Sequence, residues 1–83
     1  MEPNLLSLLP LSDLKKGEHA TLHELHTERG VASRMSSLGF TPGVEIEMTQ
    51  NYGRGPLVVS LRGTRVAMGR QEAKNTMVKR SRA

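Results

Sequence analysis

The ten residues Arg34–Gly43, RMSSLGFTPG, constrain the fold more than any other stretch of this 83-residue chain. A glycine that follows a helix-forming run commonly ends the helix in the left-handed conformation, and Gly39 is placed for that role. Phe40 follows at the position whose side chain packs back onto the last turn. Thr41–Val44 fits a type II turn, because proline suits its second position and glycine its third. We therefore predict a structural motif of helix stop, hydrophobic contact and turn, made by Leu38, Gly39, Phe40, Pro42 and Gly43.

Apolar periodicity on either side of this motif predicts one short helix among strands. Val31, Met35 and Leu38 recur at i, i+4 and i+7, which indicates a helix over about residues 31–38 with this stripe facing the core. So short a helix depends on the packing of its stripe. The segment 44–48 alternates apolar and polar residues, which is typical of a half-buried strand. The segment 18–26 alternates until Leu25 breaks the phase, which indicates a β-bulge near Glu24.

The rest of the chain is divided by glycine and proline into short elements. Strands are expected at 57–61, 66–68 and 76–79, a glycine-rich loop at 51–56, a hairpin turn at Gly63-Thr64, a helical turn within 69–75, and inward-facing Leu11 and Leu14. About five short strands and one inserted helix predict a mainly β protein, a small antiparallel barrel. Closure of the sheet would remove its exposed edges.

Composition limits the class of protein. The absence of cysteine excludes disulfides and thiolate metal sites and fits a reducing compartment. Hydrophobic residues at 36% and charged residues at 24% suit a soluble folded domain. The leucine-rich segment 1–10, MEPNLLSLLP, is too short to span a membrane, so we predict a flap or edge segment, with self-association through residues 5–9 as the alternative. The basic end, 80–83, is predicted to be a solvated tail.

Four motifs, taken in order, resemble the FeoA family of small cytoplasmic proteins in bacterial ferrous-iron transport. They are LxDLxxG at 11–17, LGFTPG at 38–43, GPLVVSLRG at 55–63 and EAKNTMV at 72–78. The same module is similar to the SH3-like domain at the C-terminus of some iron-dependent repressors, whose helix-turn-helix is not seen in these 83 residues. Thr76 departs from the larger aliphatic residue usual in the family, which predicts looser packing of the last strand.

The resemblance implies a fold and a role. The fold is an SH3-like barrel over residues 11–79. The role is that of a non-enzymatic accessory or regulatory protein that binds the membrane GTPase-permease FeoB. It further implies a cytoplasmic location, either free or peripheral at the inner face of the inner membrane. The family motifs contain scaffold residues, so they do not identify the contact residues.

Three histidines are candidate metal ligands: His19, His23 and His26. On a strand His19 and His23 share a face but lie about 13 Å apart. His23 and His26 flank the predicted bulge and can converge with Glu24 or Glu28 on a borderline metal. We expect opportunistic zinc or nickel binding at most, no dedicated Fe²⁺ site and no cofactor.

The candidate partner-binding surface is the outer side of the helix and its flanking turn, with the tip of the glycine-rich loop. It comprises Arg34, Ser37, Thr41 and Pro42, with Tyr52 and Arg54 on what we expect to be an adjacent hairpin. The Gly53–Gly55 segment lacks the lysine and following helix of a phosphate-binding loop, and no catalytic constellation is visible. The alternative function is a basic nucleic-acid-binding module, given the net charge of +4, but single-strand binders need aromatic platforms. Phe40 and Tyr52 are the two aromatic residues, so we expect no specific nucleic acid.

Overall fold

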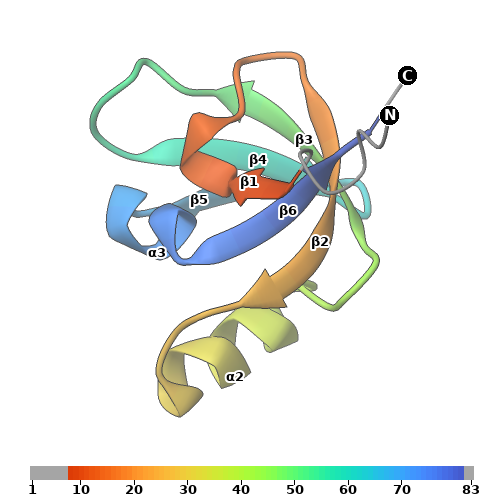
Figure 1. Cartoon of the computed structure of the whole chain (residues 1–83), viewed down its shortest axis with the longest axis vertical. Helices are drawn as coiled ribbons and strands as arrows, with labels where there is room; N and C mark the ends of the chain where they lie inside the picture. The colour runs from red at the N-terminus through yellow and green to blue at the C-terminus, as the bar shows by residue number, and fades with distance from the viewer. Residues whose placement is uncertain (1–7, 82–83) are drawn as a thin grey trace.

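The computed structural model describes residues 8–81, which form one antiparallel sheet carrying two short helices (Figure 1). The sheet order is β1-β6-β2-β3-β4-β5. In chain order the elements are β1 (Leu8–Pro10), the 3₁₀ helix η1 (Leu11–Asp13), β2 (His19–Leu25), α2 (Arg29–Ser37), β3 (Glu45–Gln50), β4 (Leu57–Leu61), β5 (Thr64–Met68), α3 (Arg70–Lys74) and β6 (Thr76–Arg80).

The mainly β antiparallel class is confirmed, but the sheet has six strands and is not closed. The sixth strand is β1, which pairs with β6 through Leu8, Leu9 and Pro10. Three residues ending in a proline give little strand signal, and proline is tolerated at a sheet edge because it has no N–H to donate. β1 and β5 are the two edges of the sheet, so the prediction that closure removes the edges is wrong.

The core forms where alternate strand residues face inward. Every other residue of β4 is buried, and Ile46 and Met48 of β3 are fully covered. Leu11 and Leu14 are also fully buried, as predicted, and close the core from the η1 side. Thr76 is only 1% exposed, and its hydroxyl donates to the Glu72 carbonyl at 2.8 Å. The polar side chain that replaces the larger aliphatic residue is therefore buried with a hydrogen-bond partner inside the core.

Two local features can be compared with the predictions from the sequence: the bulge in β2 and the turn between β4 and β5. The pairing of β2 with β6 shifts register between Leu22 and Glu24, which confirms the bulge. Leu61 of β4 pairs with Thr64 of β5, so the hairpin turns through Arg62 and Gly63. The φ values of these two turn residues are +51° and +78°. The predicted Gly63-Thr64 turn was one residue late. Two successive positive φ values match the type I′ turn that suits the twist of a hairpin.

The predicted helix stop is confirmed. α2 starts two residues earlier than predicted and ends at Ser37. Gly39 has φ +108°, its N–H donates to Ser36 O at 3.0 Å, and the Phe40 N–H donates to Met35 O at 3.0 Å. This pair of bonds is the Schellman pattern, and buried Phe40 and Met35 belong to the same core cluster.

The turn after the cap is also confirmed, whereas the predicted stripe is not. The Val44 N–H donates to Thr41 O at 3.0 Å and Gly43 has φ +89°, as a type II turn requires. Met35 is buried and Val31 half-buried, but Leu38 is 48% exposed. Leu38 caps the helix just before the chain reverses at Gly39, so its side chain lies beyond the part of α2 that the core covers.

Candidate partner-binding surfaces

The six predicted contact residues fall on two separate surfaces. Arg34 and Ser37 lie on α2, and the Thr41-Pro42 turn follows it. Tyr52 and Arg54 lie in the loop between β3 and β4, which Figure 1 shows at the opposite end of the long axis from α2. The expectation of adjacency is wrong, because the six residues of β3 carry the chain away from the helix.

The first surface is the α2 corner, which we define as Arg34, Ser37, Leu38, Thr41 and Pro42. Leu38 and Pro42 are both exposed, so the corner has an apolar centre with polar neighbours. The Ser37 hydroxyl donates to the Ser33 carbonyl at 3.1 Å, one turn back along the helix. Sequence periodicity assigned Leu38 to the core, and its place as the cap residue, one before Gly39, was the signal that could have placed it outside.

Arg34 links α2 to α3. Its Nη2 donates to Glu72 Oε2 at 2.7 Å, while Glu72 Oε1 accepts the Gly69 N–H at 3.2 Å. One carboxylate therefore caps α3 and also holds α2 through Arg34. Because Arg34 is largely exposed, the pair contributes little to stability, on the order of 0–1 kcal/mol. Arg34 nevertheless has an intramolecular partner that its sequence position, 38 residues from Glu72, did not reveal.

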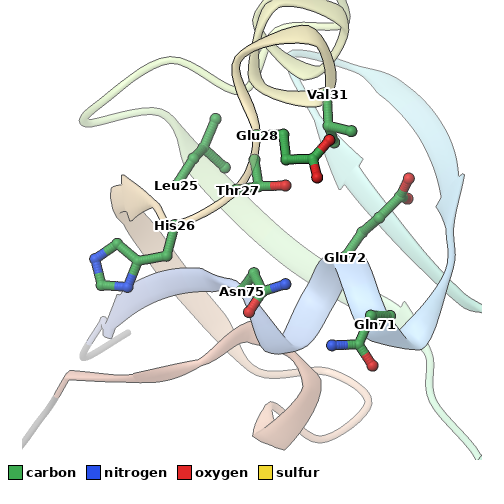
Figure 2. Close-up of a pocket in the computed structure, with 8 residues that line it drawn as sticks. All are labelled: Leu25, His26, Thr27, Glu28, Val31, Gln71, Glu72 and Asn75. Carbon is green, nitrogen blue, oxygen red and sulfur yellow. The ribbon is translucent and has the colours of Figure 1, made fainter.

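An open groove of about 780 Å³ separates the start of α2 from α3. Leu25 and Val31 contribute apolar surface, and Glu28 reaches from the start of α2 into the space (Figure 2). Its full lining is Leu25, His26, Thr27, Glu28, Val31, Gln71, Glu72 and Asn75. The lining includes two carboxylates and no lysine or arginine. None of these residues was predicted as a partner contact.

The second surface is the loop 51–56, which Asn51 and Arg70 brace. The Asn51 amide nitrogen donates to the carbonyls of Ser12 at 3.1 Å and Leu14 at 2.7 Å. Its amide oxygen accepts the Gly53 N–H at 2.9 Å and Arg70 Nη2 at 2.8 Å, and Arg70 Nε donates to Gly55 O at 3.1 Å.

The two side chains predicted to be displayed on this loop are exposed. Tyr52 is 77% exposed and Arg54 is exposed beside it. An asparagine in a glycine-rich loop was the available sequence signal for bracing, but its partners are distant along the chain. The loop therefore presents Tyr52 and Arg54 from a backbone that is fixed from both sides.

The histidines lie against carboxylates. His19 Nδ1 is 3.5 Å from Glu45 Oε2, and His23 and His26 both approach Glu24, which His26 contacts directly. His23 and His26 thus share the Glu24 carboxylate as a neighbour, while His19 lies against Glu45 of β3. Within residues 8–81 no three histidine, aspartate or glutamate side chains gather in a way that could hold a metal ion.

Basic residues at the end of the chain are tied into the sheet as far as Arg80. Arg80 belongs to β6, and its Nε lies 3.2 Å from Glu18 Oε2. The Lys15 backbone N–H, which donates to Glu18 at 2.8 Å, lowers the pKa of that carboxyl, with a smaller contribution from Arg80. Residues 82–83 and the leucine-rich 1–7 lie outside the described part of the chain, while Leu8–Pro10 form the edge strand.

Two further observations bear on function. Phe40 is buried, which leaves Tyr52 as the exposed aromatic residue, whereas binding of single-stranded nucleic acid relies on several stacked rings. None of the helices between residues 8 and 81 has the length and apolar character needed to cross a bilayer.

Comparison with known proteins identifies the family. The model of the FeoA domain matches residues 9–80. A Methanocaldococcus jannaschii protein provisionally named Fe(2+) transport protein A is 30% identical over 71 residues, covering 86% of this chain and 85% of that protein. The crystal structure of an iron uptake regulatory protein, FeoA, superposes with a TM-score of 0.84 at 27% identity, covering 89% of this chain and 99% of that one.

A zinc-complexed FeoA of Stenotrophomonas maltophilia, described as a prokaryotic SH3 domain protein, is 34% identical. Its TM-score is 0.70, with 83% of this chain and 87% of that one covered. IdeR of T. acidophilum shares the fold alone, at 16% identity and a TM-score of 0.81, with 98% of this chain and 37% of that one covered. The six-stranded sheet is thus SH3-like, and the chain belongs to the FeoA family.

Proposed function

We propose that this protein is a non-enzymatic accessory factor of Fe²⁺ uptake that binds the membrane GTPase-permease FeoB from the cytoplasmic side. Membership of the FeoA family supports a place in ferrous-iron transport. The Methanocaldococcus jannaschii relative is named for Fe²⁺ transport, and the Stenotrophomonas maltophilia FeoA has been suggested to be a ferrous iron transport activating factor. The proposal extends these roles to this chain and adds the direct contact.

The direct contact with the transporter is proposed from the structure of the α2 corner. Leu38 is nearly half exposed at the end of a helix whose stop is fixed by two backbone hydrogen bonds and by packing of Phe40. Because the backbone of Leu38 is already fixed, this exposed side chain can be buried by a partner at a reduced entropic cost, and Pro42 displays a second apolar side chain on the same corner. Arg34 adds a planar donor fork at the rim, where an acidic group of the partner can compete with Glu72.

Two matched variants test this contact in copurification from detergent extracts of iron-limited cells. Leu38→Ser removes the apolar centre of the α2 corner. Leu8→Ser removes an exposed leucine of similar accessibility, 38% against 48%, from the edge strand β1. We expect Leu38→Ser to reduce recovery of the transporter about tenfold, the effect of losing one modest anchor of roughly 1.4 kcal/mol.

Two outcomes of this copurification experiment would contradict the proposal. Equal recovery with both variants would remove the α2 corner from the interface. No recovery of the transporter with the unaltered protein would remove the partner itself. Thermal melting of each variant by circular dichroism confirms that a loss of binding does not come from a loss of folding.

A further inference from the structure

Two surfaces remain unused by this function, and they are chemically complementary. One is the braced loop 51–56, which displays an aromatic ring and a guanidinium. The other is the groove between α2 and α3, whose charged lining residues, Glu28 and Glu72, are both acidic.

Glu28 occupies a position that the fold does not explain. It is the N-cap of α2, where serine, threonine, asparagine and aspartate are preferred because their short side chains bond the first helical N–H groups. Its side chain makes no such cap bond. In the described part of the chain it also forms no ion pair, and it reaches into the groove instead (Figure 2). The second carboxylate of the groove, Glu72, is already held by Arg34 and Gly69.

Tyr52 and Arg54 are equally unexplained by the fold. Tyr52 contributes nothing to the core at 77% exposure, and neither residue pairs with an acidic side chain among residues 8–81. Several hydrogen bonds from Asn51 and Arg70 nevertheless hold the loop that carries Tyr52 and Arg54. A fixed loop that displays a tyrosine and an arginine has the composition of an interface anchor.

We propose that the protein self-associates head to tail, with Tyr52 and Arg54 of one copy entering the α2–α3 groove of the next. The ring of Tyr52 would lie on Leu25 and Val31, and the guanidinium of Arg54 would face Glu28. The loop 51–56 and α2 lie on opposite sides of α3 (Figure 1), and the groove is lined from α2 and α3, so the braced loop cannot fold back into its own groove. Contact between two different surfaces leaves each copy with one free surface, so association continues into chains or closes into a ring.

Mixing experiments distinguish this arrangement from any symmetric dimer. Tyr52→Ser disables the loop and leaves the groove intact, while Glu28→Lys disables the groove and leaves the loop intact. Each variant alone is expected to stay monomeric by sedimentation velocity across concentrations at which the unaltered protein gains mass. An equimolar mixture contains one working loop and one working groove, so it is expected to stop at a 1:1 dimer.

Controls separate charge and folding from the specific contact. Glu45→Lys makes the same charge change on β3, away from the groove, and is expected to associate like the unaltered protein. Gln71→Lys adds a cation to the groove from α3 without touching the N-cap of α2, and is expected to weaken association at least tenfold with unchanged thermal melting. An unaltered protein that stays monomeric overturns the proposal. So does a mixture that forms no dimer, or a Tyr52→Ser variant that associates normally.

Discussion

Gly39 combines two requirements that can be measured separately by substitution with alanine. Its φ of +108° disfavours any residue with a β-carbon. A β-carbon built there would also lie 2.6 Å from Leu61 Cδ1, a side chain that is only 2% exposed and has little room to move. The glycine that ends α2 therefore also allows the end of β4 to approach the chain.

The expected cost of Gly39→Ala is the sum of these two effects. Positive φ costs an alanine about 1–2 kcal/mol, from which about 0.4–1 kcal/mol is recovered by the stiffer unfolded chain. Displacing a packed leucine adds about 1–3 kcal/mol. We therefore expect a loss of about 2–4 kcal/mol, which for a domain of this size lowers the melting temperature by about 8–32 °C.

Two other glycines serve as controls. Gly43 has φ +89° but open space around its β-carbon position, so Gly43→Ala isolates the backbone effect at about 1 kcal/mol. Gly30 lies inside α2 with no positive φ and nothing within 4 Å, so Gly30→Ala is expected to stabilise the protein by about 0.5–1 kcal/mol. The three variants thus predict a large loss, a small loss and a gain.

The packing effect can be tested by a double-mutant cycle in urea. Leu61→Val removes Cδ1, the atom in conflict, so Gly39→Ala in that background is expected to cost about as much as Gly43→Ala. The coupling energy between residues 39 and 61 should then exceed about 1 kcal/mol in the relieving direction. Additive costs, or a Gly39→Ala variant as stable as Gly43→Ala, would refute the close approach of Gly39 to β4.

Four further measurements test other parts of the structure. Asn51→Ala removes four hydrogen bonds from the loop 51–56 and should cost about 2–3 kcal/mol in urea unfolding, whereas Tyr52→Ala should change stability by less than about 0.5 kcal/mol. Thr76→Val should change the free energy of unfolding by less than about 1 kcal/mol, because the Glu72 carbonyl that loses the hydroxyl still accepts the Asn75 N–H at 3.2 Å. A loss above about 2 kcal/mol would contradict this expectation. Because the pKa of Glu18 is lowered in the folded protein, the ionised carboxylate stabilises the fold above the ordinary glutamate pKa, and this effect disappears as pH falls through the lowered value. Glu18→Gln should therefore weaken the loss of unfolding free energy at acidic pH. An unchanged loss at acidic pH would argue against this role of Glu18. Anaerobic titration of metal-free protein with Fe²⁺ should give no stoichiometric heat, and a saturating 1:1 isotherm would establish a dedicated site.

Local sequence chemistry predicted the parts of the fold that depend on neighbouring residues. The helix stop at Gly39, the contact of Phe40 and the turn through Pro42-Gly43 each need only a few residues in sequence, and each is confirmed. Strand periodicity likewise identified the buried side of β3, with Ile46 and Met48 inward.

Features that depend on distant residues escaped prediction. Helical spacing placed Leu38 on the buried stripe, but spacing carries no information on how far the core extends under the helix. The bracing of the loop by Asn51 depends on carbonyls 37 and 39 residues away, and the link between Arg34 and Glu72 spans 38 residues. The separation of the two predicted contact surfaces follows from the length and direction of β3, which the pattern of individual residues does not give.

Two backbone hydrogen bonds join β2 and β3 at the ends of the segment that contains α2, and this has a consequence for how the fold can diversify. The Leu22 N–H donates to Val44 O at 2.9 Å and the Gly43 N–H to Leu22 O at 2.8 Å, so β2 and β3 are joined before the chain departs to form α2. β2 then continues in pairing with β6 as far as Leu25 before the chain leaves the sheet to form α2. Insertions near Arg29 could therefore lengthen or replace the start of the helix while the sheet keeps its register, so partner specificity can evolve separately from the scaffold.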